Sequence, residues 1–207
     1  MHVYRSDVVG SLLRPAYLKE ARQSHASGSI SDAEFKKIED QAVDEAIALQ
    51  VRSGVDVITD GEMRRDSFFG HLIDAVEGFD KLGGAVRFRD EQGGEILFHR
   101  PVVVSRLRRR RHLCVEEFTY LRACADRTAK ATLVAASQAA AHYDPVRSQS
   151  AYATLDAYLA DVVDIVREEV EELVRLGCKY IQIDAPNYAS LLDEALRERY
   201  RKRGIDP

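Results

Sequence analysis

The sequence of 207 residues contains no tryptophan, five prolines and only three cysteines. Cys114, Cys124 and Cys178 are an odd number without a C-x-x-C pair, which excludes a disulfide scaffold and is typical of a reducing compartment. No apolar run approaches the ~18 residues that a membrane span needs. The first residues also lack the apolar stretch of a signal peptide, so we expect a cytoplasmic protein without a membrane partner.

Several common functional motifs are missing as well. The sequence has no P-loop, no G-x-G-x-x-G segment and no Ser-His-Asp order, which leaves ATP use, Rossmann dinucleotide binding and nucleophilic hydrolysis with little support. The formal net charge is -4, from 30 Lys and Arg against 34 Asp and Glu. A mildly acidic protein is not a general nucleic-acid binder, so we expect no such partner.

Short apolar segments that predict strands alternate with amphipathic segments that predict helices. The predicted strands are residues 2–9, 55–62, 130–137 and 180–184. The clearest helix covers residues 155–176, where apolar residues recur at the helical period and Gly177 follows. Residues 85–107 interrupt the alternation, because two β-rich segments flank DEQGG and predict a β-hairpin.

Four strand–helix units imply a parallel sheet with right-handed crossovers. Two architectures fit this pattern, a small doubly wound sheet or the first half of a (β/α)8 barrel, since a complete barrel needs about 250 residues. We find no low-complexity linker and no strong repeat. Residues 1–207 are therefore expected to form a single domain.

Polar residues follow each predicted strand, at the end where both architectures bind ligands. They are Gly10 and Ser11, Asp60 and Glu62, Ser137 and Gln138, and Gln182 and Asp184. Each has a structural alternative: Asp60 can form a turn with Gly61, and Asp184 can cap the segment that follows it. Taken together they predict a small-molecule site, and its carboxylates suit a ligand with an ammonium group.

Two other polar features invite a functional interpretation. The basic run Arg106–Arg111 could bind an anion, or it could be a solvated edge beside acidic helices; it lacks the interleaved aromatic residues of single-strand binders, and we favour the solvated edge. His112 and Cys114 have the H-x-C spacing of a zinc pair. However, no second pair accompanies them and four arginines precede them, so we predict no metal there. His142 could line the mouth of the site or have no fixed role.

Four motifs together resemble one protein family. They are VGSLLRP, DGEMRRDSFFGHL, HRPVVV and YIQIDAPNYASLLDE, beginning at residues 9, 60, 99 and 180. In this order they are similar to the catalytic barrel of cobalamin-independent methionine synthase, in its short single-barrel relatives. The resemblance implies a (β/α)8 TIM-barrel type of fold, of which about the first four βα units and a β-hairpin excursion are present.

The resemblance also implies a reaction and a substrate site. In this family zinc activates the thiol of homocysteine, which attacks the methyl group of a methyl-folate; related barrels alkylate other thiols such as coenzyme M. Ser11, Glu62 and Asp184 match positions that hold the amino-acid substrate, the two carboxylates meeting its ammonium group and Ser11 its carboxylate. The partners implied are thus an amino-acid thiol and a methyl donor.

The zinc ligands of the family come from the second half of the barrel. We therefore expect this chain to lack them, assign it no catalytic or metal-binding residue, and expect the isolated chain to be inactive. It would be a fragment, or a half-barrel that forms a homo-oligomer or pairs with a missing C-terminal half to cover its sheet edges. A non-catalytic amino-acid-binding half-barrel is the alternative.

Overall fold

The structure is a computed structural model that describes residues 6–89 and 93–202. It consists of two compact units. The first contains Met1–Val76, Arg109–Leu133 and Arg167–Gln182, and the second contains Glu77–Arg108, Val134–Val166 and Ile183–Pro207. The single domain expected from the sequence stays a prediction. In the described residues, no helix has both the length and the apolar character of a membrane span.

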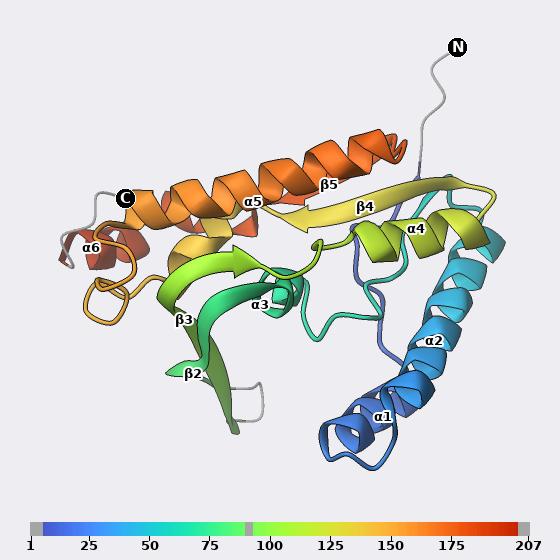
Figure 1. Ribbon diagram of the computed structural model, residues 1–207, viewed down its shortest axis with the longest axis horizontal. Coiled ribbons are helices and arrows are strands. Elements are labelled where there is room, and N and C mark those ends of the chain that lie inside the picture. Colours follow the sequence, from blue (N-terminus) through green and yellow to red (C-terminus); the bar gives the residue numbers. More distant parts are fainter. Residues whose placement is uncertain (1–5, 90–92, 203–207) are drawn as a thin grey trace. The chain divides into compact units, whose positions relative to one another are not determined.

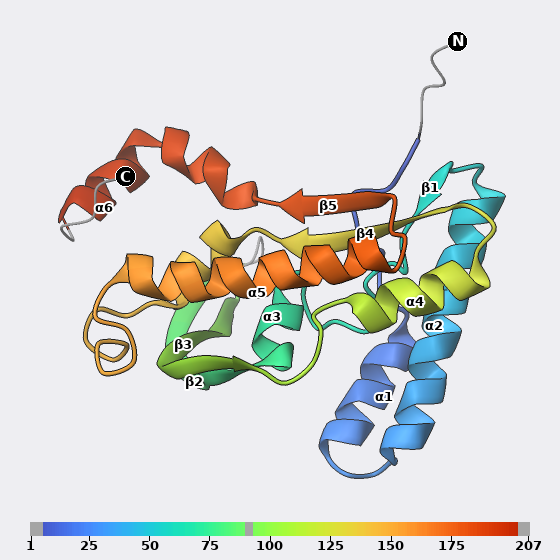
Figure 2. The ribbon, with the colours of Figure 1, turned by 45° about the horizontal axis from the view of Figure 1, so that its top comes forward.

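The first unit begins with two helices that lie side by side, α1 (Ala16–Ala26) and α2 (Asp32–Arg52) (Figures 1 and 2). A capping box starts α2: the Ser31 hydroxyl accepts from the Glu34 N–H at 3.3 Å, and the Glu34 carboxylate accepts from the Ser31 N–H at 2.9 Å. Leu18 of α1 and Val43 of α2 are fully buried in a shared core.

A three-stranded sheet has the order β1-β4-β5, formed by Val57–Ile58, Thr128–Val134 and Tyr180–Asp184. Strand β1 pairs with β4 in parallel, with Val57 opposite Thr128. Asp7 adds a single parallel bridge to Val57. The predicted first strand is therefore wrong for residues 6–9, which form only this bridge, while residues 2–5 lie outside the described residues.

This sheet makes the chain a mixed α/β protein, as the sequence predicts. Over residues 6–89 and 93–202 the sheet is not closed into a barrel, so the count of four βα units stays a prediction. Strand β1 is shorter than expected because the chain leaves the sheet after Ile58 and enters the buried turn 59–62. That turn carries the candidate site.

Helix α4 (Val115–Cys124) starts at a carboxylate supplied by α5 (Leu155–Arg175). The fully buried side chain of Glu169 accepts hydrogen bonds from the N–H groups of Cys114 at 2.8 Å and Val115 at 3.0 Å. These are two of the donors that a helix leaves unpaired at its N-terminus. A remote acid thus replaces the side-chain cap that the local sequence lacks.

The second unit contains the predicted hairpin, β2 (Val76–Arg89) and β3 (Glu95–Arg109). Both strands extend beyond the range expected from the sequence. Gly78 has φ 119°, and a Cβ there would lie 2.9 Å from the Ser105 carbonyl oxygen, so the close approach of the strands requires glycine. The remaining short elements are α3 (Gly70–Ala75), the 3-10 helices η1 (Ala136–His142) and η2 (Pro186–Leu192), and α6 (Glu194–Lys202).

Candidate functional site

The turn after β1 is fixed by side chains on both sides of it. Gln50 of α2 donates to the Thr59 carbonyl at 2.8 Å and accepts from the Thr59 N–H at 2.9 Å. The Thr59 hydroxyl then donates to the Gly10 carbonyl at 3.0 Å. Gly61 and Glu62 follow with φ 68° and 55°. A glutamate in this left-handed region is uncommon. The surrounding hydrogen bonds therefore hold the backbone of Glu62 in a conformation that it would rarely adopt otherwise.

The Glu62 carboxylate lies 1% exposed among three donors. The Ser11 hydroxyl donates to Oε2, while Thr132 of β4 donates to Oε1 at 2.8 Å and Arg65 to the same oxygen at 3.3 Å. A Cβ on Gly10 would lie 2.8 Å from Oε1, so the chain approaches this carboxylate more closely than any other residue type allows. The structure thus brings together Ser11 and Glu62, two of the three predicted site residues. That they bind a substrate stays a prediction.

Arg65 joins Glu62 to a second acid that the sequence analysis missed. Its guanidinium, 3% exposed, donates to Glu117 of α4 at 2.6 Å from Nη2 and 3.0 Å from Nε, and to the Thr132 carbonyl at 2.9 Å. Burial opposes the charge of Arg65, but Glu117 and the other nearby carboxylates outweigh it and raise the pKa of Arg65 above its ordinary value. The guanidinium therefore remains a fixed cation under the site.

Acidic groups outnumber cations around Arg65. Burial raises the pKa of Glu117 to about 7, although the charge of Arg65 acts in the opposite direction. Burial also raises the pKa of Asp60, whose Oδ1 accepts from the Glu62 N–H at 2.9 Å. Asp60 Oδ2 is buried without a hydrogen-bond partner in the part of the chain that the structure describes. The acidic cluster of Asp60, Glu62 and Glu117 thus has too little positive charge around it, and such a cluster suits a cationic ligand group.

Lys130 of β4 connects the N-terminal segment with β5. Its fully buried ammonium donates to Asp7 at 2.8 Å, to the Val8 carbonyl and to Gln182 at 2.8 Å. Gln182 in turn donates to the Val9 carbonyl at 2.7 Å. The predicted polar strand end at Gln182 therefore holds the segment that leads to Ser11.

The other predicted strand-end residues lie in the second unit. Asp184 ends β5, and its backbone carbonyl accepts from the Ala135 N–H at 2.9 Å. Ser137 lies in η1 and donates to Asn187 at 3.5 Å. The structure describes Asp184 within this unit alone, so its place beside Ser11 and Glu62 stays a prediction. His142 is buried, with Nδ1 3.0 Å from the Pro101 carbonyl.

The H-x-C pair, His112 and Cys114, lies beside the buried carboxylate of Glu169. His112 Nδ1 lies 2.8 Å from Glu169, the acid that also accepts from the Cys114 N–H. Burial, together with the charges of Glu117 and Glu169, raises the pKa of the Cys114 thiol well above its ordinary value, which disfavours the thiolate that a zinc ligand must provide. The described residues contain no group of three or more His, Cys, Asp or Glu side chains that could hold a metal ion. They do not fit the zinc site of the family.

The basic run is paired with acidic side chains in both units. Arg106 lies 3.1 Å from Asp161 and over the ring of Tyr152, whereas Arg109 lies 2.8 Å from Glu168. Such pairing supports the interpretation of Arg106–Arg111 as a solvated, ion-paired edge.

Comparison with known proteins identifies the family. A family model described as "Cobalamin-independent synthase, Catalytic domain" matches residues 5–204. The chain is 32% identical to a methionine synthase of Sulfurisphaera tokodaii and 29% identical to one of Saccharolobus solfataricus, in each case over 86% of this chain and 51% or 52% of the relative. An uncharacterized protein of Bacillus subtilis, YxjH, is 28% identical over 99% of this chain and 54% of its own length. The chain spans about half the length of these curated relatives.

Two solved structures share the fold. The B12-independent methionine synthase from Shewanella sp. W3-18-1, in complex with selenomethionine, has a TM-score of 0.70 at 20% identity and covers 95% of this chain and 55% of that one. A putative vitamin-B12 independent methionine synthase from Listeria monocytogenes has a TM-score of 0.68 at 23% identity and covers 96% and 59%. With the match over residues 5–204, the chain belongs to the cobalamin-independent methionine synthase family.

Proposed function

We propose that this chain provides the amino-acid side of a methyl-transfer site, at which the thiol of homocysteine accepts a methyl group from a methyl-folate. The observation that carries this proposal is the hydrogen-bonded pair of Ser11 and Glu62, held in the first unit by Arg65 and Thr132. Membership of the methionine synthase family supplies the reaction class.

In this proposal Glu62 accepts hydrogen bonds from the ammonium group of the substrate. The ammonium takes the place of the Ser11 hydroxyl at Oε2, and Ser11 then donates to the substrate carboxylate instead. Thr132 and Arg65 keep the other carboxylate oxygen of Glu62 in place throughout. Asp184 is proposed as the second acceptor for the ammonium group.

Activation of the thiol is the part that the described residues do not explain. The family uses zinc for this step, and these residues do not form a zinc site. We therefore expect the isolated chain to bind the amino acid without transferring a methyl group. A complete site would need ligands from a second polypeptide or from sequence beyond this chain.

A non-catalytic amino-acid-binding half-barrel is the second candidate, favoured by the same lack of a metal group among the described residues. This candidate predicts the same binding of the amino acid, but no methyl transfer, whether the chain is alone or paired with another polypeptide. A thiol such as coenzyme M fits less well, because its anionic sulfonate would meet the carboxylate of Glu62.

The test is isothermal titration calorimetry of L-homocysteine with the purified chain, together with a measurement of the zinc content of that chain. We expect binding that is lost in Glu62→Gln and kept in Glu20→Gln, an exposed glutamate of α1 that serves as the matched control. Equal binding by wild type and Glu62→Gln would refute the site. Stoichiometric zinc, or methyl transfer by the chain alone, would refute the expected inactivity.

Partner binding is proposed at the free edge of the sheet. Strand β5 is an edge strand in the described sheet, and its Tyr180 and Ile183 are 38% and 52% exposed. Exposed apolar edge strands favour pairing with another chain. We therefore expect a homo-oligomer, or a complex with a C-terminal half, and light scattering after size-exclusion chromatography distinguishes these states from a monomer.

A further inference from the structure

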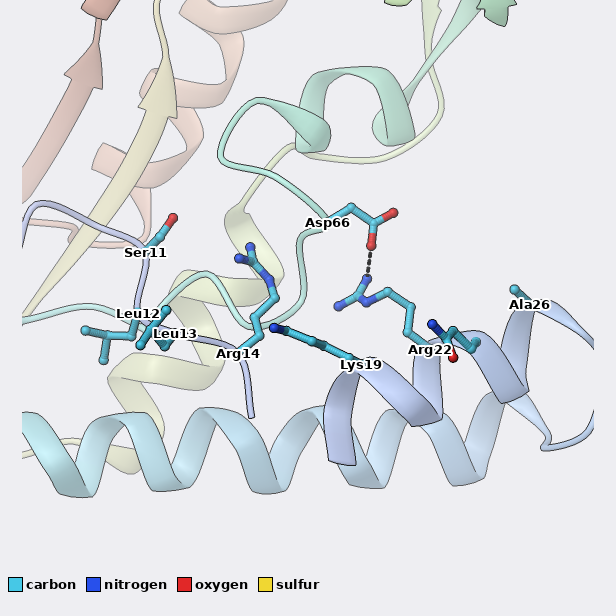
Figure 3. A pocket seen from close by; sticks show the side chains of 9 residues that line it. Ser11, Leu12, Leu13, Arg14, Lys19, Arg22, Ala26 and Asp66 are labelled. Atoms are coloured by element: carbon cyan, nitrogen blue, oxygen red, sulfur yellow. Dashed lines mark ion pairs between the residues drawn. The ribbon is translucent and has the colours of Figure 1, made fainter. Parts of the chain in front are cut away.

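A cavity of about 750 Å³ opens beside Ser11 in the first unit. It lies between residues 11–14, helix α1 and Asp66, which precedes α3 (Figure 3). Three of its lining side chains are cationic, Arg14, Lys19 and Arg22, whereas Asp66 is the acidic one. The volume falls within the range of about 300–1,000 Å³ that is typical of small-molecule sites.

The positive charges of this cavity are only partly balanced. Arg22 lies 2.8 Å from Asp66, as the dashed line in Figure 3 marks, and 3.8 Å from Glu39 of α2. Arg14 instead donates to two backbone carbonyls, those of Arg65 at 2.7 Å and Glu62 at 3.0 Å. The Lys19 side chain is exposed, and its ammonium makes no hydrogen bond or ion pair within residues 6–89 and 93–202. Two of the three cations thus have no carboxylate partner at ion-pair distance in that part of the chain.

Arg14 differs from an ordinary solvated surface arginine. Its two hydrogen bonds to the backbone carbonyls of Glu62 and Arg65 fix the direction of its guanidinium. Burial and the neighbouring charge of Arg22 lower the pKa of Arg14, although the carboxylates of Glu62 and Asp66 act in the opposite direction. An anion in the cavity would relieve this repulsion and receive charge-assisted hydrogen bonds from donors already in place.

We propose that this cavity binds a small molecule with two or more carboxylate or phosphate groups, held by Arg14 and Lys19 and, at its far end, by Arg22. The site is separate from the acidic cluster around Glu62, which suits a cationic group, and Ser11 lies where the two adjoin. The proposal does not depend on methyl transfer, since it rests on the shape and charge of the cavity alone.

The experiment is titration calorimetry of the full chain with citrate and, separately, with pyrophosphate, at low and at physiological ionic strength. The variants are Lys19→Gln, which removes the exposed cation, and Asp66→Asn, which removes the carboxylate that lines the cavity. Lys37→Gln is the matched control, because Lys37 is an exposed lysine of α2 that does not line the cavity. Far-UV circular dichroism confirms that each variant is folded.

We expect wild type to bind at least one probe, with an affinity that falls as salt rises. Lys19→Gln should weaken binding about 3- to 10-fold, Asp66→Asn should tighten it about 2- to 5-fold, and Lys37→Gln should leave it unchanged. Stronger binding of citrate identifies a carboxylate ligand, and stronger binding of pyrophosphate a phosphorylated one. The proposal is overturned if wild type binds neither probe, or if Lys19→Gln binds as tightly as Lys37→Gln.

Discussion

Replacing Glu169 by glutamine should destabilise the protein markedly, although the two side chains have the same shape. Glu169 is fully buried, accepts from the first N–H groups of α4 and lies 2.8 Å from His112 Nδ1. The amide of glutamine can still accept hydrogen bonds, but it brings no negative charge to the helix N-terminus. Its NH2 group must also find acceptors in a site built from donors.

The magnitude follows from the two backbone hydrogen bonds. A hydrogen bond to a charged group contributes about 1.5–3 kcal/mol and a neutral one about 0.5–1.5 kcal/mol. Two such changes add to about 2–3 kcal/mol, and the lost favourable interaction between the carboxylate and the helix dipole adds about 0.3–1 kcal/mol. That is a large fraction of the roughly 5–15 kcal/mol by which a domain is stable.

Urea unfolding at pH 7, followed by far-UV circular dichroism, measures this effect. Glu168→Gln is the matched control, since Glu168 is adjacent and 57% exposed and its ion pair with Arg109 should contribute less than about 1 kcal/mol. If the free energies of unfolding of the two variants agree within about 0.5 kcal/mol, Glu169 does not cap α4 and the reasoning fails.

Three further predictions concern the interior. The pKa of Glu117 is raised to about 7 from an ordinary 4.5, so its protonated form stabilises the fold fully below pH 4.5, and this contribution is lost as the pH rises through 7. Because the lowered pKa values of the buried His71 and His142 make stability rise with pH over part of this range, the quantity to measure is the urea midpoint of wild type minus that of Glu117→Gln. This difference should decrease from pH 5 to pH 8, and a constant difference would contradict the prediction. Gly10→Ala places a Cβ 2.8 Å from Glu62 Oε1, so it should displace that carboxylate, cost about 1–3 kcal/mol in urea unfolding and weaken homocysteine binding; unchanged calorimetry would argue against the close approach. Tyr158→Phe removes a buried hydroxyl that has no hydrogen-bond partner among the described residues, so thermal unfolding should show unchanged or slightly raised stability, and a loss above about 1 kcal/mol would reveal a missed partner.

The sequence predicts the regular elements better than their buried faces. Helix α5 has its predicted bounds to within a residue, yet Val163 and Val174, two of the apolar residues that recur at the helical period, are 46% and 61% exposed. The buried face instead includes Tyr158 and Glu169. Helical periodicity allows neighbouring stripes of apolar residues, and only the tertiary partners decide which stripe is covered.

Part of the candidate site could be predicted from the sequence by a general rule, and the rest could not. Ser11 and Glu62 could be predicted because both follow predicted parallel strands, whose carboxyl ends meet. Arg65 and Glu117 are 52 residues apart in the sequence, and charged residues are normally exposed, so no local pattern predicts that they pair in the interior. The adjacent motif DGEMRR was the available signal for Arg65, and Glu117 had none.

The contacts of Lys130 set an order for the assembly of the site. Its ammonium group binds Asp7 and Gln182, which are 123 residues before it and 52 residues after it in the chain. Translation therefore has to pass residue 182 before the last of these hydrogen bonds can form. Because contacts between residues distant in sequence form slowly, we expect the hydrogen bonds of Gln50 with Thr59 to form before those of Lys130.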